Sequence, residues 1–144
     1  VTYCIRNDIG TLIVGYNTTF QRSSDLGRQM NQVFVGIPFG ILRRKLKYLC
    51  EMNGIRYVEQ EESYTSMASF WDLDEMPVYG EAGFVPPVFS GRRICRGLYQ
   101  DRSGRRINAD VNGALNIMRK CNIVSLRALY DRGDVDTPVR IRIA

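Results

Sequence analysis

The pattern that most restricts the fold is an apolar run, an amphipathic helix and a second apolar run, which follow one another in the first 60 residues. The run TLIVG at residues 11–15 has the length and composition of a buried strand. Apolar residues recur at three- and four-residue steps across residues 39–50, which predicts a helix that ends at Asn53-Gly54. The run IRYVEQ at residues 55–60 predicts a second strand. This order favours a parallel pair with a crossover helix, and therefore an α/β fold.

The other segments carry weaker patterns. Residues 17–32 are polar and predict an exposed loop, while residues 63–107 are rich in proline and glycine with little periodicity and predict a loop-rich insertion. The closing residues 136–144, DTPVRIRIA, alternate apolar residues with arginines. They predict either a short edge strand or a frayed tail.

One further helix is expected from about residue 109 to 120, with Asn108 as its N-cap and Asn122 as its stop. These patterns together divide the chain into three segments. They are residues 1–62 (strand, helix and strand), residues 63–107 (insertion) and residues 108–144 (helix and tail).

The chain contains no histidine, and this excludes several classes of site. Ser-His and Cys-His nucleophilic sites and His-ligated metals are impossible within it, so catalysis would have to rest on carboxylates. The four cysteines are far apart in sequence, which is typical of free thiols in a reducing compartment. With 20 Lys and Arg against 15 Asp and Glu, the net charge of +5 favours nucleic acid as a partner. No run approaches the roughly 20 apolar residues of a membrane span, so a cytoplasmic, nucleoid-associated protein is expected.

Two groups of acids are candidates for a metal site. Asp110 lies in NADVNGALNI, where the small neighbours would let another backbone come close. Glu59, Glu61 and Glu62 lie at the carboxyl end of the second predicted strand, where ligands bind in open α/β sheets. Hard oxygen donors of this kind suit Mg²⁺ or Mn²⁺. The alternative for Asp110 is an aspartate that the helix dipole stabilises in the first turn. The alternative for the glutamates is a solvated strand end. The acids of DLDE at residues 72–75 are expected to be solvated surface.

Arginines are concentrated between Phe89 and Arg106, where they outnumber acids six to one. Their planar forks can each hold two phosphate oxygens, although a solvated basic loop is the alternative. The six are Arg92, Arg93, Arg96, Arg102, Arg105 and Arg106. A carboxylate metal site beside such a loop is the composition of a centre that cleaves phosphodiesters with two metal ions roughly 4 Å apart.

The stretches EESYTS and RRICRGLYQDRSGRRINADVNGALNIMRK resemble the C-terminal part of the TnpB/OrfB family. Members of this family are encoded by insertion sequences, described as transposases and related to type V CRISPR effectors. The resemblance implies a partial RNase H-like (RuvC) fold and a magnesium-dependent DNA endonuclease guided by RNA, so DNA and a guide RNA are the expected partners. It implies that Asp110 is a catalytic metal ligand and that Asn116 matches a family asparagine that contacts nucleic acid. Arg92, Arg93, Arg105 and Arg106 would hold backbone phosphates.

The second catalytic acid departs from the family pattern. It usually follows the strand matched here by TLIVG, but this chain has Asn17 and no glutamate there. Some branches of the family take this acid from just before the TS stretch, which implies Glu62 as the second metal ligand, with Glu61 in reserve. If neither serves, the protein is a nuclease-inactive, RNA-guided DNA-binding protein or a decayed transposase fragment.

The chain also departs from the family pattern at the zinc ribbon that many relatives carry. Where they carry two CxxC pairs, this chain has Ser69 and Asp72 near the first pair and Gln100 and Ser103 near the second. Because four thiolates normally close such a site, no zinc is expected. Packing of the aromatic residues is expected to hold the insertion instead. These residues are Phe70, Trp71, Tyr79 and Phe89.

The first catalytic aspartate of the family lies on a strand upstream of every segment matched here. The chain begins in mid-pattern at Val1, and Asp8 lacks the expected context. We therefore expect a C-terminal piece whose missing N-terminal portion is a further partner, and an isolated chain that does not cleave DNA.

Overall fold

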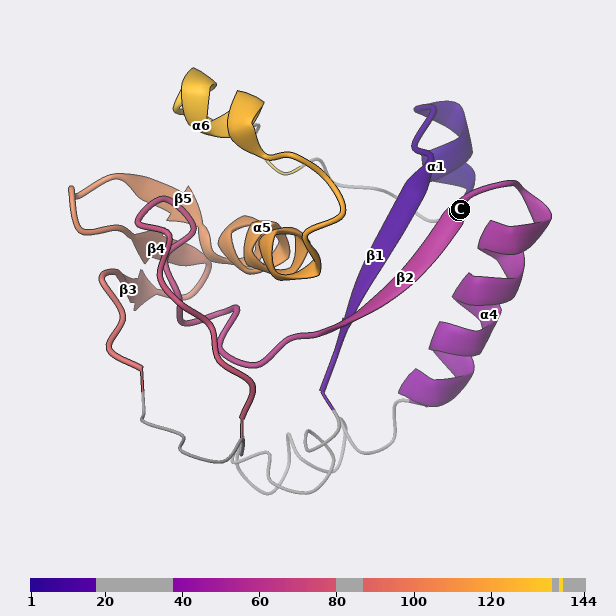
Figure 1. Ribbon diagram of the computed structural model, residues 1–144, viewed down its shortest axis with the longest axis horizontal. Helices are drawn as coiled ribbons and strands as arrows, with labels where there is room; N and C mark the ends of the chain where they lie inside the picture. The colour runs from indigo at the N-terminus through magenta and orange to yellow at the C-terminus, as the bar shows by residue number, and fades with distance from the viewer. Residues whose placement is uncertain (18–37, 80–86, 136–137, 139–144) are drawn as a thin grey trace. The chain divides into compact units, whose positions relative to one another are not determined.

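The computed structural model describes residues 1–17, 38–79, 87–135 and 138, and it combines helices with two small sheets (Figure 1). The chain divides into two compact units, residues 1–60 and residues 61–144. The expected mixture of helices and strands is confirmed. Residues 18–32 of the predicted loop and all of the closing segment 136–144 except residue 138 lie outside the described residues. None of the described helices is long and apolar enough to cross a membrane.

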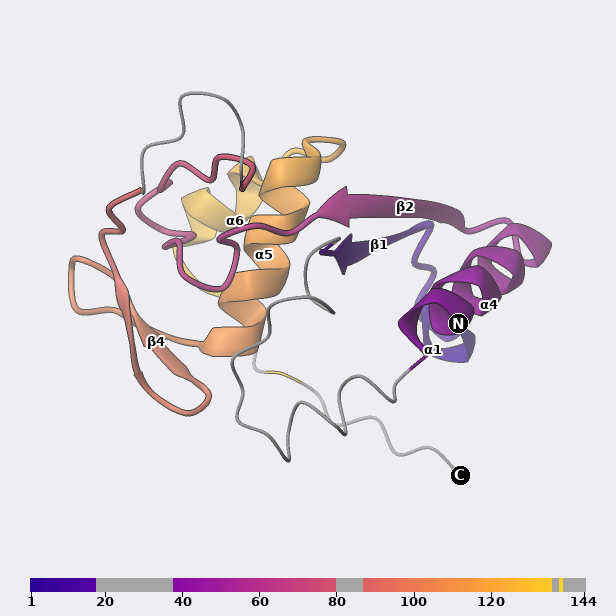
Figure 2. The same cartoon turned by 90° about the horizontal axis from the view of Figure 1, so that it is seen from below.

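The first unit contains helix α1 (Thr2–Arg6), strand β1 (Thr11–Tyr16), helix α4 (Phe39–Met52) and strand β2 (Arg56–Glu61). The two strands form a two-stranded sheet, and their arrows point the same way in Figure 2. The predicted strand, helix and parallel strand are therefore confirmed.

Helix α4 ends where the sequence predicted. The side-chain amide of Asn53 donates to the Leu49 carbonyl at 2.7 Å, and Gly54 then takes a left-handed conformation with φ of 66°. Less of the apolar face of this helix is buried than its sequence pattern predicted. Leu42 and Leu49 are exposed, and only Cys50 is fully buried. The small core of this unit gathers Cys4, Cys50 and Ile55.

The second unit contains strands β3 (Arg92–Cys95), β4 (Leu98–Gln100) and β5 (Arg106–Asn108), followed by helices α5 (Ala109–Cys121) and α6 (Arg127–Arg132). The strands form an antiparallel sheet in the order β3-β4-β5. The segment expected to be loop-rich thus carries three strands of three or four residues each, which are too short to show a two-residue period. The core comprises Phe70, Tyr99, Ile107, Ala109 and Leu115.

Helix α5 forms almost where it was predicted. The side-chain oxygen of Asn108 accepts the backbone N–H groups of Asp110 at 2.9 Å and Val111 at 3.1 Å. At the other end Asn122 takes the left-handed conformation that ends many helices. Both expected cap residues are confirmed.

Tyr99 gives the second unit a dependence on alkaline pH. Burial, followed by the charges of Asp74, Asp72 and Asp101, raises the pKa of Tyr99 to about 12. Because this pKa lies above its ordinary value, the stabilisation is complete below about pH 10 and is lost as pH rises through about 12. Its hydroxyl donates to the Met67 carbonyl at 2.7 Å. Tyr99→Phe should therefore cost about 1 kcal/mol at neutral pH.

Urea unfolding at a series of pH values checks this expectation. The difference between wild type and Tyr99→Phe should shrink and then change sign between about pH 10 and pH 12, because a rise in pKa from 10.0 to about 12 corresponds to more than about 1 kcal/mol. A difference that stays constant over this range would contradict it.

Candidate functional site

Glu61 is neutralised within its own unit. One carboxylate oxygen lies 2.5 Å from the Lys120 ammonium nitrogen, and the other accepts the Ser63 N–H at 2.6 Å. Burial alone would raise the pKa of the Glu61 carboxyl, but the hydrogen bonds from Lys120 and Ser63 outweigh it and leave the pKa lowered. This carboxylate is therefore ionised, and Lys120 and Ser63 already bind both of its oxygens.

Glu62 has the opposite environment. It is partly buried, and burial followed by the neighbouring charge of Glu61 raises the pKa of its carboxyl. In the described part of the chain, no hydrogen bond or ion pair is made to its side-chain oxygens. A partly desolvated carboxylate beside another acid is the kind of group that a cation would stabilise. The structure thus distinguishes two neighbouring acids that the sequence left as alternatives.

The third acid of the group, Glu59, belongs to the first unit and is also paired. Its carboxylate accepts from the Arg43 guanidinium at 3.1 Å and from the Tyr57 hydroxyl at 3.0 Å. The expected cluster of three glutamates is therefore divided among different partners.

Asp110 lies in the first turn of α5 and is exposed. It shares the second unit with Glu62 but comes from a different element. Across the described ranges, no three acidic or cysteine side chains gather closely enough to hold a metal ion. The joint role of Glu62 and Asp110 as metal ligands therefore stays a prediction.

Three of the four arginines expected to hold phosphates are exposed on the short sheet. Arg92, Gln100 and Arg106 are paired across β3, β4 and β5, so their side chains share one face. Arg93 pairs with Tyr99 and is also exposed. We call the row formed by Arg92, Gln100 and Arg106 the arginine row.

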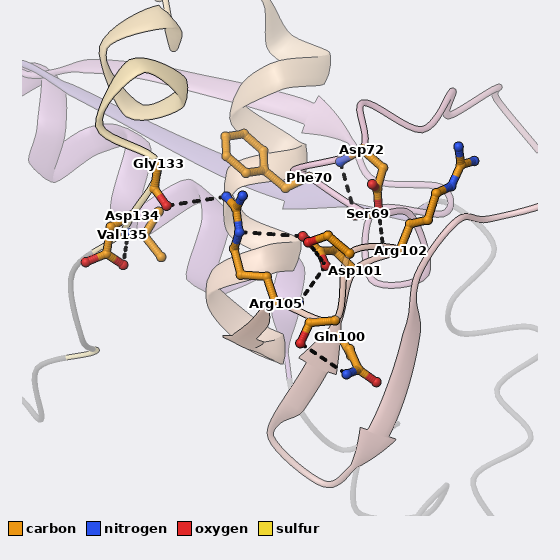
Figure 3. Close-up of polar contacts among 12 residues, drawn as sticks. Ser69, Phe70, Asp72, Gln100, Asp101, Arg102, Arg105, Gly133, Asp134 and Val135 are labelled. Carbon is orange, nitrogen blue, oxygen red and sulfur yellow. Dashed lines mark hydrogen bonds and ion pairs between the residues drawn. The ribbon is translucent and has the colours of Figure 1, made fainter.

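The guanidinium of Arg105 contacts other residues of the second unit. It donates to the Gly133 carbonyl at 3.3 Å and lies 3.7 Å from the Asp101 carboxylate (Figure 3). It also lies 4.5 Å from the centroid of the Trp71 ring. These three contacts give Arg105 a structural role. Its side chain nevertheless keeps 45% of its surface exposed, so the expected phosphate contact stays a prediction.

Asn116 is also placed differently from the expectation. It has no exposed surface, and its amide donates to the carbonyls of Thr65 at 2.9 Å and Ala68 at 2.7 Å. A fully buried side chain offers no surface to a nucleic acid, so its role here is internal. Asn112, which the sequence analysis overlooked, is equally buried and lies one turn earlier on α5.

Hydrogen bonds join residues that lie near the two expected cysteine pairs. The Ser69 hydroxyl accepts the Asp72 N–H at 3.3 Å, and the Asp72 carboxylate accepts the Arg102 N–H at 3.0 Å (Figure 3). In the second turn, the Asp101 carboxylate accepts the Ser103 hydroxyl at 2.8 Å. Side chains near both expected cysteine pairs thus hold backbone turns together.

Two further acids complete this network, and the sequence analysis missed their roles. Asp74 accepts the N–H groups of Ser69 at 2.8 Å and Ser90 at 2.9 Å, and Asp101 also accepts the Arg105 N–H at 2.7 Å. The acids of DLDE were expected to be solvated, and this expectation was wrong for Asp72 and Asp74. An aspartate two to five residues from a turn amide is the signal that could have found them.

The expected aromatic packing divides into two groups. Phe70 and Trp71 pack together with centroids 5.2 Å apart. Tyr79 and Phe89 contact Tyr64 instead, at 6.4 and 5.8 Å between ring centroids.

The arginine row leads to a prediction about nucleic-acid binding. Arg92→Ala and Arg106→Ala should each reduce the slope of log affinity against log salt concentration by about 1, because each phosphate contact releases condensed counterions. Arg105→Ala should leave this slope unchanged and lower stability instead. Fluorescence anisotropy of labelled DNA and RNA between low and physiological salt measures the slope. Equal slopes for all three variants would contradict the assignment of phosphate contacts to Arg92 and Arg106 but not to Arg105.

Comparison with known proteins supports a nucleic-acid function for this region. Residues 39–117 match the family model described as Cas12f1-like, TNB domain. The match covers more than half of the chain and includes Glu62, the arginine row and Asp110. No curated protein matches the chain.

Proposed function

Because this chain belongs to the Cas12f1-like, TNB domain family, and is thereby a relative of RNA-guided nucleases of the TnpB and Cas12 type, we propose that it is the nuclease portion of an RNA-guided DNA endonuclease. Its partners are nucleic acids, with guide RNA and target DNA as the proposed pair. The first unit, with its parallel strands and crossover helix, would be part of an RNase H-like (RuvC) core. The observation that carries the proposal is the partly buried Glu62 carboxylate, which has no cationic partner among the described residues while the adjacent Glu61 has one.

The donor set suits a hard divalent cation. Glu62 and Asp110 offer carboxylate oxygens, and the raised pKa of Glu62 indicates that its charge is not yet compensated. A bound magnesium or manganese ion would supply Lewis-acid activation of water and neutralise charge at the cleaved phosphate. Glu62 would hold such an ion from the end of β2, and Asp110 would hold it from the first turn of α5.

The arginine row would position the nucleic acid. The guanidinium groups of Arg92 and Arg106 can hold phosphate oxygens from one face of the sheet. Contacts of this kind fix the location of a strand and carry no base preference. Sequence selection would then come from pairing with the guide RNA.

A second function is favoured by the incomplete acid set. Among the described residues no three acidic or cysteine side chains gather closely enough to hold a metal ion. Asn17 stands where a glutamate is usual in the TnpB/OrfB family that the sequence resembles. The arginine row needs no metal. A nuclease-inactive, RNA-guided DNA-binding protein would keep these features, whereas a decayed transposase fragment would show neither binding nor cleavage.

The test is guide-directed cleavage by the protein expressed from its complete reading frame together with the RNA that co-purifies with it. Cleavage of a matched duplex that requires Mg²⁺ and is lost in Asp110→Ala supports the endonuclease. Target binding without cleavage at any Mg²⁺ or Mn²⁺ concentration supports the binding protein. If the protein shows neither target binding nor cleavage, the decayed transposase fragment is the remaining explanation.

We propose further that the turns around Ser69 and Ser103 need no zinc. Carboxylates and hydroxyls, which occupy the regions of the family's thiolates, already have backbone and side-chain partners. Thermal unfolding should therefore be unchanged after dialysis against a strong chelator. A structural zinc site contributes about 10 kcal/mol or more to folding, so its loss would be obvious. One equivalent of tightly bound zinc in purified protein would contradict the proposal.

A further inference from the structure

One face of helix α5 is polar and faces backbone carbonyls. Asn112, Asn116 and Lys120 recur at four-residue steps, so they lie above one another on the helix. Asn112 donates to the Ala68 carbonyl at 2.8 Å and accepts the Phe70 N–H at 3.1 Å. Lys120 donates to the Ser63 carbonyl at 3.2 Å as well as to Glu61. With the two bonds from Asn116, this face holds the backbone of residues 63–70 at several points.

The same backbone segment begins directly after Glu62. The Thr65 N–H and hydroxyl both donate to the Glu62 carbonyl, at 3.2 and 3.0 Å. Thr65 in turn offers its own carbonyl to the Asn116 amide at 2.9 Å. A continuous series of hydrogen bonds thus connects α5 through Thr65 to the backbone of Glu62.

The turn is held in a conformation that it would not keep unaided. Tyr64 has a φ of 65°, a left-handed conformation that an aromatic residue rarely adopts. Such conformations persist where the surrounding contacts determine them, and they concentrate at functional sites. Here the contacts on either side of Tyr64 are those of Lys120 to Ser63 and of Asn116 to Thr65.

The asparagines are a costly way to pack a helix against a turn. Both are fully buried, and within the described structure the side-chain oxygen of Asn116 has no hydrogen-bond partner. An apolar residue of the same volume would avoid this unsatisfied oxygen, but it would remove the donor to the Thr65 carbonyl. What the amides add is a fixed position for particular carbonyls, which points to a geometric role.

We propose that Asn112 and Asn116 are positioning residues that fix the Glu62 backbone relative to α5, the helix that also carries Asp110. The inference rests on the proposed nuclease function, because it assigns the asparagines to the geometry of its two carboxylates. Asp110 lies two residues before Asn112 on one helix. The clamped turn therefore fixes where the Glu62 backbone lies along this helix.

The test compares Asn116→Leu, which keeps the volume and removes the amide, with Met118→Leu on the same helix as a volume-conserving control. In single-turnover assays of the guide-loaded protein, Asn116→Leu should cleave roughly 10- to 100-fold more slowly. It should bind target DNA as wild type does and require more Mg²⁺ for half-maximal rate. Hydrogen exchange should show lost protection at Thr65, Met67 and Ala68, with α5 still protected.

Thr65→Val is the second variant, in case Asn116→Leu does not fold. It removes the hydroxyl bond to Glu62 without altering α5, and should also slow cleavage with unchanged DNA affinity. Folded variants that cleave at the wild-type rate, while Glu62→Gln does not cleave, would overturn the positioning role alone. If wild type does not cleave, or if Glu62→Gln cleaves normally, the proposed nuclease function fails and this inference fails with it.

Discussion

Glu62→Gln should abolish guide-directed DNA cleavage, whereas Glu61→Gln should leave most of it. A carboxylate that holds a catalytic metal contributes several kcal/mol to the transition state, and about 4 kcal/mol corresponds to a rate lower by a factor on the order of 10³. The change from glutamate to glutamine alters charge and little else, so the two variants form a matched pair. Single-turnover cleavage at saturating Mg²⁺ measures both.

The different expectation for Glu61 follows from its partners. Its carboxylate is bound to Lys120 and to the Ser63 N–H, so glutamine would leave the Lys120 ammonium without its counter-charge. The expected result is a loss of about 1–3 kcal/mol in the free energy of unfolding, with cleavage by the folded fraction nearly intact. If Glu61→Gln abolishes cleavage and Glu62→Gln does not, the catalytic assignment moves to Glu61. If both variants cleave normally, neither acid holds the metal.

Phe70→Ala should cause the largest loss of stability of any single change in the second unit. The Phe70 ring is fully buried, stacks on Tyr130 at 4.8 Å between centroids and packs against Trp71. Removing a buried aromatic ring of this kind costs about 3–5 kcal/mol, a large part of the 5–15 kcal/mol that holds a typical domain together. Urea unfolding followed by tryptophan fluorescence reports it directly, because Trp71 lies beside the deleted ring.

The matched control is Val88→Ala, since Val88 is 95% exposed. Its free energy of unfolding should stay within about 0.5 kcal/mol of wild type. Tyr130→Phe provides an intermediate case, because it keeps the stacked ring and removes only the hydroxyl bond to the Phe70 carbonyl. It should cost about 1 kcal/mol. Equal losses for Phe70→Ala and Val88→Ala would show that this cluster is not the core of the unit.

Local patterns predicted the regular elements well. The first strand, the crossover helix, the second strand and α5 depend on periodicity and caps within a few residues, so their limits could be read from the sequence. Strands β3, β4 and β5 have three or four residues each and depend on pairing with one another. Helix α6 depends on packing of Tyr130 against Phe70, which lies 60 residues earlier. No local pattern reports such pairings.

The sequence predicted which residue types the candidate site contains, but it did not predict which partners each side chain contacts. Sequence spacing and the family resemblance marked Glu61, Glu62 and Asp110 as candidate acids. Spacing could not separate Glu61 from Glu62, because the ammonium that neutralises Glu61 comes from Lys120, 59 residues away. Arg105 was likewise indistinguishable from Arg106 until Trp71 and Asp101 were found against it.

The pairing of β3 with β4 and of β4 with β5 also sets the distance between two cations. Neighbouring strands lie about 4.8 Å apart, so the backbones of Arg92 and Arg106, two strands apart, are separated by roughly 10 Å. Nucleotides in one strand of a duplex rise about 3.4 Å each. The two guanidinium groups could therefore contact phosphates of different nucleotides on one bound strand, whatever its bases.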